Sequence, residues 1–503
     1  MVRDHPQPAQ RVRRDAHHQH RPDRHDHGVD PAIGRVLRRR GRRGLGPVRG
    51  RRRRRVRRMM PSPTTRASEL RTPYSGRAAL EGVLAEGCEM QHAVIRQYGT
   101  QTIVLLEPSS IRHCFITNAV NYRQAAARKR LMEPVLGESI LTGEGDISVK
   151  VRQQIATLFN RPALETYAAR IREHAEAATG DLDDGVGDAA AMTARIALEN
   201  LSLTLFSGAL SDHVEDLLSA LDAVYDAMHG LPLLGEEGGV AYYPHVDRPA
   251  RQDAARRLRQ VVHGIVERRL AEDAPRGDLL DRLIGLRRDA ARGDVSAEQM
   301  VGDVVTFIIA GHETTAATVA WALFLLSRDA VALARASAET DRVVNDGVPP
   351  GEWPDRLPFL LACVEETQRL YPPVPVITRQ AIEDDALPGL DIGKGSVVMA
   401  PVRLIHRMHR YWDQPGRFRP DRFLPGNREQ IERYSYLPFG LGPRMCIGAA
   451  FGNREATIML AVILRRFRPR YAGGADPVPL LKVVLRADNG IPMLFERRQG
   501  PQR

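Results

Sequence analysis

The 503-residue sequence predicts a mainly α-helical fold with minor β structure, organised as one large domain over residues 61–503. Three observations support this prediction. Apolar residues recur at helical spacing from about residue 65 onward. One apolar stretch, from Ser296 to about Asp329, is long enough to cross the middle of a large domain as a single helix. Segments with strand character are short and lie mostly near the C-terminus.

Residues 1–60 differ from the rest of the chain in composition. They contain 20 Arg, no Lys and 5 Asp, a net charge of +15, so the remaining residues carry −3 of the chain's +12. We expect this segment to be disordered, because it holds too few apolar residues to offset chain entropy. A nucleic-acid arm and an anchor to an anionic surface would both suit it. A start codon assigned too far upstream explains the same Arg-rich composition, since Met59 and Met60 stand where the globular pattern begins.

Several classes of protein are disfavoured by composition. No stretch reaches the ~18 consecutive apolar residues that a membrane span needs, and no apolar segment typical of a secretory signal follows the basic start. The cysteines are widely spaced and form no CxxC pair, which argues against a disulfide scaffold or a structural zinc site. We therefore expect a cytoplasmic monomer. The four cysteines are Cys88, Cys114, Cys363 and Cys446.

The individual elements follow from periodicity and from punctuation by Gly, Pro and Asn. Ser296 is predicted to cap the long helix, with Glu298 in its first turn. The other predicted helices are Leu80–Tyr98, Ser109–Ile116, most of residues 150–290 with breaks near Gly180–Gly187 and Gly230–Tyr243, and Ala449–Phe467. The predicted strands are Thr102–Leu106, Ser396–Met399, Lys482–Leu485 and Pro492–Phe495, with a turn at Asp488–Gly490.

The segment Phe439–Gly448 holds the most unusual local sequence. Its glycines, Gly440, Gly442 and Gly448, allow the backbone to wrap closely around the sulfur of Cys446. Arg444 and the amides at the start of the following helix favour a thiolate over a thiol. Most cysteines in turns are buried and inert, and that is the alternative here. The clustering of three glycines, an arginine and a cysteine favours a functional thiolate.

This segment resembles the haem-binding signature of the cytochrome P-450 family, Phe-x-x-Gly-x-Arg-x-Cys-x-Gly, at every specified position. The resemblance implies that Cys446 is the axial ligand of the iron of haem b. It also implies that Arg444 pairs with a haem propionate and that Phe439 packs beside the cysteine loop. The implied fold is that of the family, in which the haem lies between a long central helix and the cysteine loop.

The long helix carries a second motif, Ala310-Gly311-His312-Glu313-Thr314-Thr315. The zinc motif H-E-x-x-H is excluded, because position 316 is Ala. Glycine and an acid–alcohol pair are unfavourable in mid-helix, so they indicate either a kinked core helix or a local opening for a ligand. The motif is similar to the family's oxygen-binding signature. That similarity implies that Gly311 leaves room for O2 and that Glu313 and Thr314 relay protons.

A third motif lies at Glu366-Thr367-Gln368-Arg369, where Glu366 and Arg369 share one helical face. Alone it is a weak signal, but Leu370-Tyr371-Pro372-Pro373 follows it and Arg419-Pro420-Asp421-Arg422-Phe423 comes later. Together these segments look like the family's Glu-x-x-Arg helix and Pro-x-Arg-Phe segment. The resemblance implies a buried structural cluster of Glu366, Arg369 and Arg422.

Two further arginines, Arg379 and Arg152, match family positions that bind the haem propionates. Ser148 departs from the pattern, because the family commonly has Trp or His four residues before Arg152. The function implied is a haem-thiolate monooxygenase that inserts one atom of O2 into a small hydrophobic substrate. The sequence shows no reductase segment, so a separate ferredoxin and its reductase are expected to supply electrons.

Two alternatives remain at this stage. A haem peroxygenase or isomerase that uses peroxide would suit the cysteine loop, although such members of the family tend to lack the pair seen here as Glu313-Thr314. A nucleic-acid-binding protein that acts through the Arg-rich arm belongs to a different class and would bind in a salt-dependent manner. Residues 61–503 offer that class no recognition motif, so no nucleic-acid partner is expected.

Overall fold

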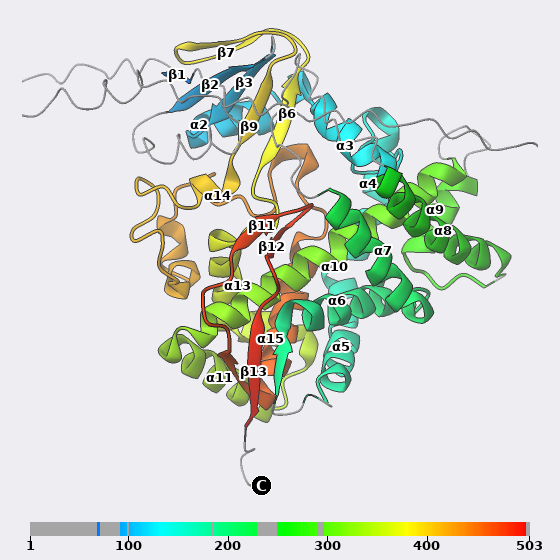
Figure 1. The fold of residues 1–503 in the computed structure, drawn as a ribbon, viewed down its shortest axis with the longest axis vertical. Helices are drawn as coiled ribbons and strands as arrows, with labels where there is room; N and C mark the ends of the chain where they lie inside the picture. Colours follow the sequence, from blue (N-terminus) through cyan, green and yellow to red (C-terminus); the bar gives the residue numbers. More distant parts are fainter. Residues whose placement is uncertain are drawn as a thin grey trace, which may run out of the picture. The chain divides into compact units, whose positions relative to one another are not determined.

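The computed structural model describes residues 68–70, 91–97, 100–180, 182, 185–228, 249–272, 274–288 and 296–498 (Figure 1). The segment 1–60, for which disorder is predicted, lies outside the described residues. All described elements belong to one unit, Pro63–Arg503. The helices are α2 Pro108–Arg112, α3 Ala126–Leu136, α4 Gly145–Ala156, α5 Arg161–Ala178, α6 Ala189–Leu205, α7 Val214–Ala227, α8 Pro249–Ala271, α9 Leu279–Arg288, α10 Ala297–Ser327, α11 Ala330–Asn345, α12 Trp353–Arg356, α13 Pro358–Leu370, α14 Val402–Ile405 and α15 Ala449–Arg466.

The strands form one larger sheet and three small ones. The six-stranded sheet has the order β1-β2-β3-β9-β6-β4, and a three-stranded sheet has the order β10-β13-β5. Two hairpins, β7-β8 and β11-β12, complete the β structure of the described residues. The strands are β1 Ser68–Leu70, β2 His92–Gln97, β3 Thr100–Leu105, β4 Tyr122–Arg123, β5 Val186–Asp188, β6 Ile377–Ala381, β7 Asp385–Leu387, β8 Leu390–Ile392, β9 Val397–Ala400, β10 Phe467–Tyr471, β11 Pro479–Leu481, β12 Leu485–Ala487 and β13 Pro492–Arg497.

The predicted long helix is confirmed as α10, which runs for 31 residues. Ser296 caps it by accepting a hydrogen bond from the backbone N–H of Gln299. Among the described residues, α10 is the one helix long and apolar enough to cross a membrane, but 78% of its apolar window is buried inside the protein. It packs against α6, α8, α13 and α15 (Figure 1) and so is the core helix of the domain.

Two predicted elements are wrong. Of the predicted helix Leu80–Tyr98, residues 80–90 and 98 lie outside the described residues, and residues 92–97 form β2, which pairs antiparallel with β3. Ala93, Val94 and Ile95 are all buried there, and an apolar run buried on both faces has no period that separates strand from helix. Lys482–Leu485, placed in a strand, is mainly the bend between β11 and β12, where the N–H of Lys482 bonds to the carbonyl of Val484.

Most other predicted elements in the described residues are confirmed within a few residues. The helix Ser109–Ile116 appears as α2 followed by a π-helical turn at His113–Thr117. The turn at Asp488–Gly490 is present, with Asn489 at φ 62° and Gly490 at φ 77°, a conformation suited to Asn and Gly. The six-stranded sheet and the π-helical turn matter for the site, because β6 carries Arg379 and the turn packs against the cysteine loop.

Candidate active site

A cavity of about 1040 Å³ is lined by the middle of α10 and by the loop that precedes α15. These are the two segments that the sequence singled out, although they lie more than 120 residues apart in the chain. From α10 the lining includes Phe307, Gly311 and Thr314, and from the loop it includes Phe439 and Cys446. The fold therefore brings the two strongest motifs to one enclosed space.

Glycine at two loop positions gives the cysteine loop its shape. Gly440 and Gly442 adopt φ angles of 68° and 72°, in the left-handed region that other residues avoid. A Cβ on Gly442 would lie 1.9 Å from the carbonyl oxygen of Phe115, in the π-helical turn. The N–H of Cys446 donates to the carbonyl of Phe439 at 2.9 Å, which curls the chain over the cysteine. Only glycine at 442 allows the turn and the loop to pack this closely.

The side chain of Cys446 is exposed and lines the cavity, within a densely packed part of the protein. Burial raises the pKa of its thiol, and the N–H of Gly448 and the guanidinium of Arg152 lower it by a smaller amount. An amide at the start of the helix thus acts as expected, but the cation that lowers the pKa is Arg152 rather than Arg444, and burial outweighs both. A sulfur that coordinates a metal loses its proton regardless of this balance.

Three arginines, Arg128, Arg379 and Arg444, line the same cavity. Burial lowers the pKa of each, and repulsion adds to the effect: Arg444 acts on Arg128, and both act on Arg379, whose pKa falls to about 9. Glu144 is the acidic residue that counters the effect on Arg379 and Arg444. Such a cluster of half-buried cations favours an anionic ligand.

Sulfur on one part of the lining and a group of half-buried cations on another form a donor set that fits haem. The sulfur suits the iron, and the guanidiniums suit two carboxylates. Arg379 and Arg444 were predicted for this role, whereas Arg128 was missed because no local pattern distinguishes it from the neighbouring Lys129 and Arg130. Arg152 also lines the cavity, but its Nη2 donates to the carbonyl of Met445, so it is engaged beside Cys446.

The residues of the α10 motif point in two directions. Gly311 and Thr314 line the cavity, and the Thr314 hydroxyl donates to the carbonyl of Ala310 at 2.8 Å. A Cβ on Gly311 would lie 2.8 Å from a methyl group of Leu201, so glycine also permits α6 to pack closely here. Its role is therefore not only to leave space for a ligand.

Glu313 is 3% exposed and is not among the cavity-lining residues. Its carboxylate pairs with Nε of Arg486 at 2.7 Å, and Arg486 in turn pairs with Asp222 of α7 at 3.1 Å. The Nε2 atom of His312 lies 3.4 Å from the other oxygen of Glu313. Glu313 and Thr314 are adjacent in sequence, but their side chains bond to different partners and not to each other.

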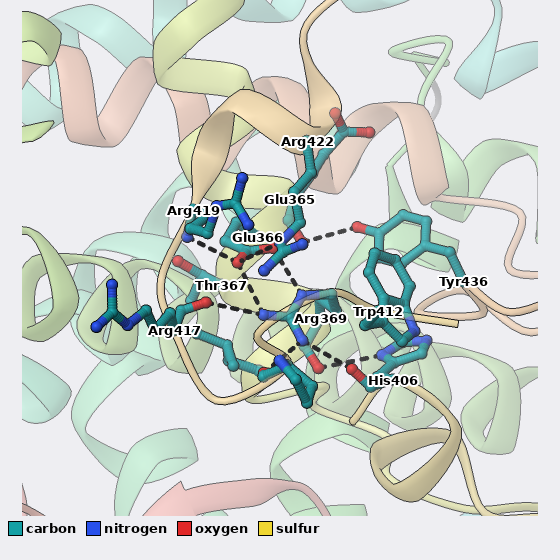
Figure 2. Close-up of polar contacts among 12 residues, drawn as sticks. Glu365, Glu366, Thr367, Arg369, His406, Trp412, Arg417, Arg419, Arg422 and Tyr436 are labelled. Atoms are coloured by element: carbon teal, nitrogen blue, oxygen red, sulfur yellow. Dashed lines mark hydrogen bonds and ion pairs between the residues drawn. The ribbon is translucent and has the colours of Figure 1, made fainter. Parts of the chain in front are cut away.

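The third motif forms a buried charged cluster, shown in Figure 2. Arg369 binds Glu366 through two contacts, Nε–Oε2 at 2.7 Å and Nη2–Oε1 at 2.8 Å. Its remaining donors reach the carbonyls of His406, Pro415 and Arg417. Arg422 adds a longer contact to Glu366 at 3.4 Å. The geometry agrees with the implied cluster of Glu366, Arg369 and Arg422, with Arg369 at its centre.

His406, which the sequence did not single out, joins this cluster to the cysteine loop. Burial lowers its pKa to about 3, with a further contribution from Arg369, so the ring is neutral. Its Nδ1 faces the carbonyl of Arg369 at 3.2 Å, and its Nε2 accepts from the N–H of Leu437 at 2.8 Å. Leu437 lies two residues before Phe439, so the ring connects α13 to the start of the loop.

Comparison with known proteins shows what the whole chain is similar to. Residues 90–493 match the family model described as Cytochrome P450. Cyclooctatin synthase from Streptomyces melanosporofaciens is 31% identical over 389 residues, which span 73% of this chain and 79% of that protein. Pentalenene oxygenase from Streptomyces avermitilis is 28% identical and covers 77% of this chain and 86% of its own length.

A plant protein and a solved structure extend the comparison. Protein LUTEIN DEFICIENT 5 from Arabidopsis thaliana, a chloroplastic protein, is 26% identical over 79% of this chain and 71% of its own length. The crystal structure of the cytochrome P450DA heme domain superimposes with a TM-score of 0.70 at 23% identity, covering 84% of this chain and 92% of that one. This structural likeness supports the fold.

Proposed function

The chain belongs to the cytochrome P450 family and is therefore a haem-dependent monooxygenase, and from that premise we propose that Cys446 supplies the axial thiolate. One observation carries the assignment. Of the cysteines in the described part of the chain, Cys446 lines the cavity, whereas Cys114 and Cys363 are buried in the core. When bound through a thiolate, haem supplies the oxidising chemistry that activates O2.

The protein's own groups hold the cofactor and manage protons. Arg128, Arg379 and Arg444 would bind the two propionates, because they are half-buried, mutually repelling cations on the cavity wall. The hydroxyl of Thr314 would pass protons within the cavity, since it is placed there by its bond to Ala310. Glu313 would act as the proton source only after leaving Arg486, to which it is now paired. We therefore assign Thr314 the direct role and Glu313 an indirect one.

The proposed substrate is a small apolar organic molecule. Phe307, Val374, Val376 and Ile377 line the cavity, as expected for hydrophobic recognition. Val304 and Ile308, on the same helix as Phe307, are buried in the core and do not line the cavity. One relative is named as an oxygenase of pentalenene, and its similarity to this chain supports the same class of substrate.

Electrons are proposed to come from a separate ferredoxin and its reductase. Four arginines near the cysteine loop and its supporting segments are candidates for docking such a partner: Arg407, Arg410, Arg444 and Arg454. Each donates to a backbone carbonyl of this chain, so the protein already uses them internally. Turnover with reductant and O2, but not with hydrogen peroxide alone, would distinguish the monooxygenase from the peroxygenase alternative.

Replacing the ligand tests the central assignment. Cys446→Ser should abolish the absorption band of the reduced carbon-monoxide complex after which the family is named, because that band requires a thiolate on the iron. The matched control is Cys363→Ala, which removes a thiol buried in α13 and should leave the band in place. An intact band in Cys446→Ser would show that another group binds the iron.

A further inference from the structure

Glu455, in α15, is a buried acid that the proposed mechanism does not use. Its side chain is 1% exposed, and neither carboxyl oxygen has a hydrogen-bond partner of good geometry. Its nearest polar neighbours are Asn200 of α6 and Thr315 of α10. The Nδ2 atom of Asn200 is also buried and without a partner. An ionised carboxylate in such a place is strongly disfavoured.

The groups around the carboxyl of Glu455 place its pKa close to neutral pH. Burial raises the pKa of Glu455 to about 8, while Asn200 and Thr315 lower it by a smaller amount. Both of these neighbours are uncharged. The titratable groups in the network lie beyond Asn200: Nδ1 of His174 in α5 is 2.8 Å from its Oδ1, and Nε2 of His174 is 2.6 Å from Glu199. The carboxyl is thus neutral at pH 7 and able to ionise slightly above it.

Only one side chain separates this carboxyl from the haem cavity. Thr315 lines the cavity, and its hydroxyl faces the carbonyl of Gly311 at 3.3 Å. A Cβ on Gly452 would lie 3.8 Å from this hydroxyl, so α15 passes close behind it. A charge that appears in the cavity will therefore act on Glu455 through a dry, weakly screened interior.

We propose that Glu455 is a proton store coupled to the charge of the cofactor. Reduction adds one electron from the redox partner to the haem iron, and the carboxylate of Glu455 takes one proton from solvent to form an O–H bond. Oxidation releases both. The physical cause is repulsion between two negative charges, which favours the protonated acid when the cofactor is reduced. The inference rests on the proposed function only in requiring haem in this cavity.

The test is the midpoint potential of the haem-loaded protein as a function of pH. Between about pH 7 and pH 10, around the pKa of about 8, the wild-type potential should fall as pH rises. The limit is about 59 mV per pH unit, the electrical equivalent of a tenfold change in proton concentration for one electron. Glu455→Gln keeps the shape of the side chain but cannot titrate, so its slope should be clearly smaller.

A matched control is Glu365→Gln, which alters a buried acid on α13 that pairs with Arg428, and it should keep the wild-type slope.

Infrared difference spectra on reduction should show a carboxylic C=O band that shifts in D2O and is absent from Glu455→Gln. If Glu455→Gln does not fold, the dependence of the midpoint potential on pH in the wild-type protein and in Glu455→Asp still tests the proposal. A flat wild-type potential, or equal slopes in wild type and Glu455→Gln, would overturn the proposal. The carbon-monoxide band, recorded for every variant, separates this failure from a failure of the Cys446 assignment.

Discussion

Single side chains determine what each face of α10 contributes. Thr314 faces the cavity, Glu313 faces Arg486, and Thr315 faces Glu455, although the three residues are consecutive. Successive residues on a helix point about 100° apart, so a motif read as one functional unit is divided among three environments. Thr314 and Thr315 both line the cavity, whereas Glu313 does not.

The Thr314 assignment predicts a specific defect in Thr314→Ala. The variant should still consume reductant but release hydrogen peroxide, because the cavity has lost a hydroxyl that passes protons. A positioned acid–base group contributes roughly 10²- to 10⁴-fold, so product formed per reductant should fall severely. The measurement is the ratio of product and peroxide to reductant consumed.

Two further variants serve as controls for this result. Thr314→Ser retains the hydroxyl and should recover much of the coupling. Thr340→Ala removes a similar bond between a threonine and the carbonyl four residues earlier, but in α11, and should have no effect on coupling. Full coupling in Thr314→Ala would mean that protons reach the cavity by another route.

A local motif was enough to predict the Glu366–Arg369 pair, whose two members lie three residues apart. The roles of Cys446 and Arg444, which rest on a motif of the same kind, stay predictions. Arg128, His406 and Glu455 were not predicted, because their partners lie at least 30 residues away and no short pattern records the contact. The strength of a sequence signal therefore follows from how local the contact is.

Between elements, the most important connection runs from α13 through Arg369 and His406 to the cysteine loop. Arg369 is fully buried and uses its donors on Glu366 and on three carbonyls. His406 then fixes the backbone at Leu437. The position of the loop thus depends on a helix that does not itself carry the cysteine.

This connection predicts unequal costs for the two arginines of the cluster. Arg369→Ala should lower the free energy of unfolding by about 3–5 kcal/mol, since it leaves the fully buried carboxylate of Glu366 with only the longer contact to Arg422 and the N–H of Arg419. Arg422→Ala should cost about 1 kcal/mol, because its contact to Glu366 is longer, at 3.4 Å, and lies nearer the surface. Denaturant unfolding of the haem-loaded proteins measures both.

Arg470→Ala serves as the control, because it removes an exposed pair with Glu496 and should change stability by no more than about 0.5 kcal/mol. Equal losses in Arg369→Ala and Arg422→Ala would contradict a cluster centred on Arg369.

Elements with a clear period were predicted well, and short apolar segments were not. α10 has a capping serine and a long apolar run, so its start was predicted correctly and its end to within two residues. β2 was mistaken for a helix, because its identity depends on pairing with β3, which sequence spacing alone does not reveal.

For the molecule as a whole, buried acids set how stability responds to pH. Burial raises the pKa of Asp303, in α10, to about 7, with the N–H of Ile140 acting the other way. The folded chain therefore holds a proton that the unfolded chain loses near pH 4, the usual range for this acid. Stability from this group is greatest below that pH and falls as pH rises to about 7.

Asp303→Asn should remove this fall. The amide oxygen can still accept from Ile140, which donates to Asp303 Oδ1 at 2.5 Å. Relative to wild type, the variant should gain about 4 kcal/mol between about pH 4 and pH 7, from about three pKa units. Denaturant unfolding at several pH values measures this gain, and a difference independent of pH would contradict it.

The three arginines of the cavity also bear on how much enzyme a cell can accumulate. Without an anion between them, repulsion among Arg128, Arg379 and Arg444 destabilises the folded state. An anionic porphyrin bound there would remove this repulsion. A ligand that binds only the folded chain stabilises it by mass action. The amount of intact enzyme should therefore rise and fall with the supply of haem during expression. The cofactor is then a condition of the protein's survival as well as of its chemistry.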